Sequence, residues 1–244
     1  MTDTIRIQKR FNGPHDSGNG GYSAGLDAVE ATLRAPIPLD VTLRAHATDT
    51  GLDIMTDDAA TRILIMSLRP TWLETPNVKS PGLEAAIVAA ATFPNFEDHV
   101  LPHCFVCGPA RAEGDGLRIF ADWLKEPSGL DNPNAFPIVA APWQPTPDLA
   151  DDSGRIAPEF LWAALDCPGA FAIDKEPILL GRMTAKIIDR PTTDAAIIAV
   201  AWSKGQDRRK HFAGSALFTE SGALLAFSEQ TWIQIDAHAP PKEL

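Results

Sequence analysis

The stretch FLWAALDCPGAFAI, residues 160–173, contains one charged residue, Asp166. Its run of apolar residues, with Pro158 suited to a first helical turn, predicts a buried helix that Pro168-Gly169 breaks or kinks at its far end. A carboxylate in such a helix loses hydration, so it must accept hydrogen bonds, take up a proton or face a cavity that admits polar substrate. The third possibility makes Asp166 a candidate catalytic residue. A carboxylate satisfied by backbone donors or by an arginine is the alternative.

The surroundings of this helix are echoed earlier in the chain. AALDC around Asp166 is similar to AGLDA around Asp27, and PILL at 177–180 is similar to PIPL at 36–39. A two-residue insertion after the second helix aligns both pairs. The order of these matches, a helix, then a proline, then an alternating strand, indicates a diverged internal duplication.

Hydrophobic periodicity predicts one helix and several antiparallel strands in each half. Ser17 or Asn19 can cap the first helix, which follows the turn GPHDSGNGG. The apolar face of that helix is expected to comprise Tyr22, Leu26, Val29 and Leu33. In the first half, strands are expected at 5–11, 40–48, 52–55 and 61–68. In the second half they are expected at 117–123, in an apolar segment that ends near residue 143, and at 178–188, 195–203, 211–219 and 223–235. The last four are expected to form a meander.

The domain boundaries follow from this pattern. Residues 1–80 are predicted to form the N-terminal repeat, residues 81–101 a linker region with an Ala-rich helix at 83–92, and residues 102–244 the C-terminal repeat. A chain of 244 residues can bury a full core as one large domain or as two such repeats.

Composition and charge exclude several classes of function. The net charge of −11 argues against nucleic acid and anionic membrane as partners. The first residues lack a secretory h-region and no apolar run is long enough to span a bilayer, which predicts a cytoplasmic protein without a membrane partner. Three cysteines form an odd set that fits a reducing compartment better than a disulfide framework.

A single apolar helix wrapped by a curled antiparallel sheet, present twice, resembles a double hotdog of the α+β class. The segments that carry the resemblance are NGGYSAGLDA with APIPLDVTLRA, CFVCGPARAEGDGLRI and PEFLWAALDCPGAFA. They resemble acyl-CoA thioesterase-like hotdog proteins, in particular those with a Cys-x-x-Cys-Gly strand entry and a single Asp on the helix. The resemblance implies hydrolysis of a thioester of coenzyme A or of an acyl carrier, with no cofactor apart from the coenzyme A of the substrate.

The resemblance also implies a composite catalytic site. Hotdog thioesterases place a backbone N–H donor at a glycine-rich helix start near a carboxylate on another helix. Here Gly20 and Gly21, with Asn19, supply the glycine-rich start, and Asp166 of the other repeat is expected to be the general base or nucleophile. The mirror site, Asp27 with the Pro158 end, is expected to be degenerate because proline has no N–H.

Substrate-binding residues are expected around this site. His15 lies just before the glycine turn and could polarise substrate, although a loop histidine beside a capping Asp16 is the alternative. Trp162 either fills the core or lines an acyl pocket. Asp27 is either a substrate contact or a structural residue. The basic cluster of Arg208, Arg209 and Lys210 could contact the phosphates of coenzyme A, or form a solvated hairpin.

The segment His103-Cys104-x-x-Cys107 invites a zinc interpretation, with His99 four residues earlier. A structural zinc site normally needs a further ligand pair, and the sequence offers no convincing one, so no metal is predicted. Cys167 is expected to be a small buried core residue.

Two other functions stay open, a hotdog hydratase or dehydratase and a catalytically silent binder of acyl groups or small molecules. A hydratase would need a catalytic His paired with Asp or Glu. The oligomeric state is open as well, since a double repeat could be a monomer or assemble further.

Overall fold

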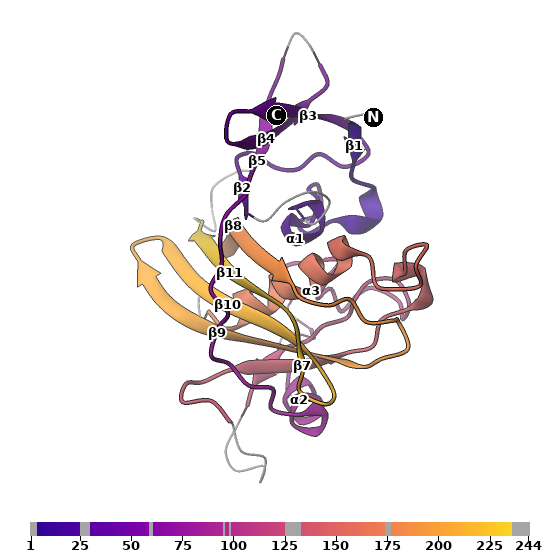
Figure 1. Cartoon of the computed structure of the whole chain (residues 1–244), viewed down its shortest axis with the longest axis vertical. Helices are drawn as coiled ribbons and strands as arrows, with labels where there is room; N and C mark the ends of the chain where they lie inside the picture. The colour runs from indigo at the N-terminus through magenta and orange to yellow at the C-terminus, as the bar shows by residue number, and fades with distance from the viewer. Residues whose placement is uncertain are drawn as a thin grey trace.

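The computed structural model describes residues 4–24, 30–58, 61–94, 96–97, 99–124, 133–173 and 177–235. Their strands form one antiparallel sheet that carries three α-helices (Figure 1). No helix among these residues is long and apolar enough to cross a membrane. The strands are β1 Thr4–Arg6, β2 Glu30–Leu33, β3 Thr42–Thr48, β4 Gly51–Thr56, β5 Leu64–Arg69, β6 Asp122–Trp123, β7 Val139–Trp143, β8 Ile178–Ile187, β9 Ile197–Asp207, β10 Lys210–Thr219 and β11 Leu224–Gln234.

The sheet order is β1-β3-β4-β5-β2-β8-β11-β10-β9-β7-β6. The first five strands belong to the N-terminal half and the other six to the C-terminal half. They meet where β2 pairs antiparallel with β8, with Glu30 opposite Thr184 and Thr32 opposite Arg182. In each half the strand after the central helix, β2 or β8, therefore lies at the junction, beside the last strand of that half.

Three helices are positioned by this sheet. Helix α1 (Gly20–Ala24) and helix α3 (Pro158–Phe171) lie side by side, whereas helix α2 (Leu83–Ala90) lies at the far side of β7 (Figure 1). Along β9, Ile197, Ala199 and Ala201 pack into the cluster that contains α3, whereas Ile198 and Val200 pack with the apolar side of α2. Side chains of a strand alternate between the two faces of the sheet, and here a helix covers each face. The first six residues of β9 are therefore all apolar instead of alternating between apolar and polar.

Helix α3 begins at Pro158 as predicted and continues through Pro168-Gly169 to Phe171, so of the predicted break or kink the break is wrong. The Leu165 carbonyl accepts hydrogen bonds from Ser215 Oγ (2.7 Å) and Gln230 Nε2 (2.5 Å). Pro168 has no N–H, so the Ala164 carbonyl loses its helical donor. The buried donors from β10 and β11 stabilise the helix at the next carbonyl, that of Leu165.

Several local predictions differ from the structure. Leu33 lies in β2 rather than on the first helix, and Leu26 and Val29 lie outside the described residues. The proline echo is wrong: Pro177 directly precedes β8, whereas Pro36 follows β2 and opens no strand.

The predicted strands also differ in extent and pairing. The first strand ends at Arg6, and 117–121 is not strand. The expected four-strand meander is wrong because β8 pairs with β11, leaving β9, β10 and β11 as the meander. Adjacency along the chain decides hairpins but not such crossovers.

Candidate functional site

Asp166 and Gly21 meet where α1 packs on α3. The Gly21 N–H donates a hydrogen bond of 3.0 Å to Asp166 Oδ2, although the two residues are 145 positions apart. The side chain of Asp166 is buried, and the residue is 3% exposed. The structure thus brings together the carboxylate and the glycine N–H that the sequence placed on different halves of the chain.

The close approach of the helices depends on glycine at position 21. A Cβ built there would lie 2.7 Å from the Trp162 carbonyl oxygen and 2.8 Å from Asp166 Cβ, both closer than van der Waals contact. Asn19 caps α1 as predicted, because its Oδ1 accepts the Tyr22 N–H at 2.8 Å. Gly20 packs instead toward Leu180 and contributes no hydrogen bond to Asp166 among the described contacts.

The environment of Asp166 favours its neutral form. The pKa of Asp166 is raised to about 7, chiefly because burial removes water from the carboxylate; the Gly21 N–H and the Asn19 side chain oppose this shift, and a negative charge on Cys104 adds to it. Its second oxygen, Oδ1, is buried without a hydrogen-bond partner among the described residues. A polar atom of this kind is costly to bury and is typical of a site that awaits a ligand or a proton.

This environment predicts that Asp166 makes stability depend on pH. The folded protein keeps a proton that the unfolded chain releases near the ordinary pKa of 3.8. The contribution of Asp166 is therefore fully present below about pH 4 and lost as pH rises through about 7, a change of about 4 kcal/mol at most. Asp166→Asn lacks this dependence, so urea unfolding should show its stability rising relative to wild type from acid to mildly alkaline pH. A constant difference between the two proteins would contradict the assignment.

A basic depression of about 330 Å³ borders the loop before α1. Asn12, one of its lining residues, bridges to Gly18 in that loop. Asp115 is its one acidic lining residue and pairs with two of the cations, Arg10 at 3.2 Å and Arg111 at 3.1 Å. The lining cationic and histidine residues are Lys9, Arg10, His15, His103 and Arg111.

The other predicted substrate contacts are dispersed. Trp162 is buried at 3% exposure in the core. His15 is exposed, lines the basic depression and pairs with Asp16 at 2.5 Å. Asp27 lies outside the described residues. The exposed β9–β10 turn region holds Arg208, Arg209 and Lys210. In the described contacts, neither Asp166 nor Gly21 approaches this turn.

Comparison with known proteins gives matches in structure alone. No family model matches the chain, and no curated protein matches its sequence. The crystal structure of a candidate thioesterase from Novosphingobium aromaticivorans superposes on 96% of this chain and 95% of its own, with a TM-score of 0.57 and 12% identity. This chain has a hotdog fold.

Shorter hotdog structures match less of the chain. The Escherichia coli PaaI protein of the phenylacetic acid degradation operon covers 40% of this chain and 76% of its own, with a TM-score of 0.38 and 10% identity. A mutant hypothetical thioesterase from Streptococcus pneumoniae covers 39% and 81%, with a TM-score of 0.37 and 10% identity.

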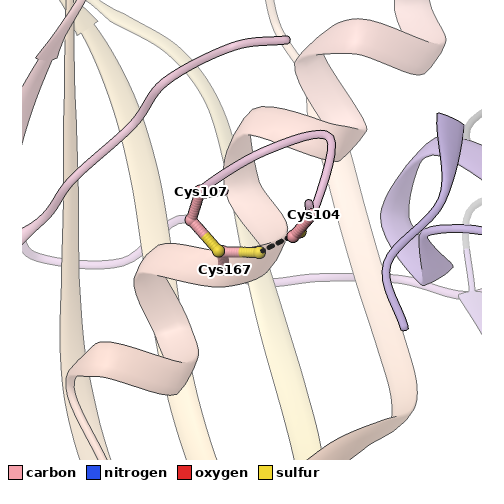
Figure 2. Close-up of side chains that lie close together, drawn as sticks. All are labelled: Cys104, Cys107 and Cys167. Atoms are coloured by element: carbon pink, nitrogen blue, oxygen red, sulfur yellow. Dashed lines mark hydrogen bonds between the residues drawn. The ribbon is translucent and has the colours of Figure 1, made fainter. Parts of the chain in front are cut away.

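Within this hotdog fold, the feature that sequence reasoning missed is the grouping of all three cysteines of the chain. Cys104 and Cys107 lie on the loop before β6, and Cys167 lies on α3, next to Asp166 (Figure 2). The Sγ atoms all lie within 4.8 Å of one another, and those of Cys104 and Cys167 are 3.7 Å apart. Hydrogen bonds from the other two thiols lower the pKa of Cys104 well below its ordinary value. His103 is exposed and is not part of the group.

Proposed function

We propose that the protein hydrolyses an acyl thioester, with an acyl-CoA or acyl-carrier thioester as substrate, at the contact between two hotdog repeats. The observation that carries the proposal is the buried Asp166 carboxylate of one half against the Gly21 N–H of the other. This pair supplies a proton acceptor and an oxyanion donor, the two groups that thioester hydrolysis requires. The likeness of the fold to a candidate thioesterase agrees with this chemistry.

A double hotdog accounts for the topology. The order β1-β3-β4-β5-β2 in the first half is repeated as β7-β9-β10-β11-β8 in the second, with α1 between β1 and β2 along the chain and α3 between β7 and β8. Such repetition is the expected outcome of an internal duplication. Only one competent site is proposed, because α3 begins at Pro158, which has no N–H to offer a carbonyl oxygen.

The reaction would proceed in two steps. A thioester carbonyl replaces Asp166 as the acceptor of the Gly21 N–H, and ionised Asp166 removes a proton from a water whose oxygen attacks the carbonyl carbon. The Gly21 N–H stabilises the resulting oxyanion. The tetrahedral intermediate then expels the thiolate, which takes the proton from Asp166, leaving a carboxylic acid and a free thiol. One water is consumed and Asp166 returns to its charged form.

The basic depression is proposed as the binding place of the phosphate groups of coenzyme A. Lys9, Arg10 and Arg111 contribute three positive charges, against the carboxylate of Asp115 in the lining and that of Asp148, which pairs with Arg10 at 2.8 Å. The depression adjoins the loop that leads to Gly21, whereas Arg208 and Arg209 lie on an exposed hairpin. The phosphates would therefore be held beside the loop that leads to Gly21.

Two variants, each lacking one positive charge, distinguish the basic depression from the β9–β10 turn as the binding place of the phosphates. Lys9→Ala is expected to raise KM for an acyl-CoA by about threefold or more at low salt, with kcat unchanged, because an exposed cation contributes to binding of a phosphate and not to chemistry. Arg209→Ala removes the same charge from the hairpin and is expected to leave KM unchanged. Steady-state kinetics at two salt concentrations decide between them. The opposite pattern would place the phosphates at the β9–β10 turn.

The proposed activity is tested by thiol release from a panel of short, long and aromatic acyl-CoAs. Turnover that depends on wild-type enzyme concentration is the expected result. If no panel member is hydrolysed while the protein is folded, acyl-CoA hydrolysis is wrong.

A silent binding protein is the second candidate, and one observation favours it. Asp166 is 3% exposed, hydrogen bonded to Gly21, and absent from the lining of the basic depression. A carboxylate held in this way could simply fasten α1 to α3. Saturable binding of an acyl-CoA without thiol release, measured by calorimetry, would support this candidate.

A further inference from the structure

The cysteine group joins two distant parts of the chain. Cys104 and Cys107 come from a Cys-x-x-Cys-Gly turn, and Cys167 comes from α3, sixty-three positions after Cys104. They are 1%, 3% and 7% exposed, so all three residues are buried. These are all the cysteines of the chain, and none forms a disulfide. We propose that Cys104, Cys107 and Cys167 bind a zinc ion through their three thiolates.

The separation of the sulfur atoms fits this ion. With a Zn–S bond of about 2.3 Å and tetrahedral angles, two ligand sulfurs stand ~3.8 Å apart. Cys104 Sγ and Cys167 Sγ are 3.7 Å apart, and Cys107 Sγ is within 4.8 Å of both. A shift of at most about 1 Å would bring the third sulfur to the tetrahedral separation.

The turn that carries two of the thiols is built as a ligand loop. The Gly108 N–H donates to the Cys104 carbonyl at 2.9 Å and closes the turn. A Cβ at position 108 would lie 2.6 Å from the backbone N and O of Cys104, so the turn requires glycine. The thiols of Cys107 and Cys167 favour the thiolate of Cys104 most, and the backbone N–H groups of Cys107 and Val106 add to this effect. Backbone donors to a sulfur orient it and support its charged form, as outer hydrogen bonds do in metal sites.

Thiolates select soft metal ions, and three protein ligands leave one position of the zinc tetrahedron for water or another small donor. Among the described residues, no His, Asp or Glu joins the group as a fourth ligand. Sequence reasoning found no further ligand for the Cys-x-x-Cys pair, and Cys167 supplies one only because α3 packs against the turn. The metal would tie that turn to the helix residue next to Asp166.

Metal analysis of the full chain tests this proposal. Protein purified without chelator should hold about one zinc per chain, and each of Cys104→Ser, Cys107→Ser and Cys167→Ser should reduce this at least about tenfold. His103→Ala is the matched control, since it alters the neighbouring exposed residue and should keep the metal. Cobalt added to the zinc-free protein should show thiolate-to-metal charge-transfer absorption in wild type and His103→Ala only.

Thiol counting on wild type keeps the test valid if a serine variant fails to fold. Zinc should slow alkylation of the three thiols relative to chelator-treated protein, whereas burial alone would protect the thiols equally with and without chelator. Protein with three reactive thiols, no metal and no cobalt absorption would overturn the proposal. So would a Cys104–Cys167 disulfide, seen as a loss of two hydrogens in the intact mass, or copper in place of zinc. Loss of zinc from His103→Ala would overturn the assignment of three thiolates. These readouts do not depend on thioester hydrolysis.

Discussion

Asp166→Asn is expected to reduce thioester hydrolysis by about 10²- to 10⁴-fold, the usual effect of removing a general base. Asparagine keeps the shape of aspartate, and its Oδ1 can still accept the Gly21 N–H, so the contact of α1 with α3 should remain. What disappears is the group that accepts the proton of the attacking water. The loss should fall on kcat and on kcat/KM alike, because the proton transfer occurs in the transition state.

A second buried carboxylate provides the control. Asp122 on β6 is 6% exposed and accepts a hydrogen bond from Thr92 Oγ1 at 2.8 Å, but β6 is at the edge of the sheet. Asp122→Asn should therefore retain wild-type turnover. Kinetics of thiol release should be compared for both variants after circular dichroism has verified folding. Equal activity of Asp166→Asn and wild type would remove Asp166 from the mechanism.

The largest loss of stability is expected from Gly169→Ala. A Cβ at this helix position would lie 1.7 Å from Gln230 Oε1. The amide cannot move freely, because Oε1 accepts Trp232 Nε1–H at 2.8 Å and Nε2 donates to the Leu165 carbonyl. Moving it leaves buried polar groups unpaired, which adds to the steric cost. The free energy of unfolding should fall by about 3 kcal/mol, measured by urea denaturation.

A double-mutant cycle separates this clash from a general effect of alanine in the helix. Gln230→Ala alone should destabilise the protein because Trp232 Nε1 and the Leu165 carbonyl lose their partner. In Gly169→Ala/Gln230→Ala the clash is gone, so the double variant should be more stable than the sum of the two single effects predicts. Additive effects would show that contact with Gln230 is not the cause.

Local pattern in the sequence determined much of the site. The start of the helix at Pro158, the lone charge of Asp166 in an apolar run and the capping role of Asn19 are all properties of neighbouring residues. Helical and strand periodicity report which side of an element is buried, and a cap or a first-turn proline acts within a few residues. These features are therefore readable without knowledge of any distant contact.

Tertiary structure alone decided which distant segments meet. The Gly21–Asp166 hydrogen bond, the pairing of β2 with β8 and the grouping of Cys167 with the Cys-x-x-Cys turn each join residues far apart in the chain. The continuation of α3 past Pro168 also depends on donors from β10 and β11. Periodicity gives the buried face of a helix but not the partner that covers it, because many apolar surfaces would bury it equally well. Backbone packing and sheet register make that choice.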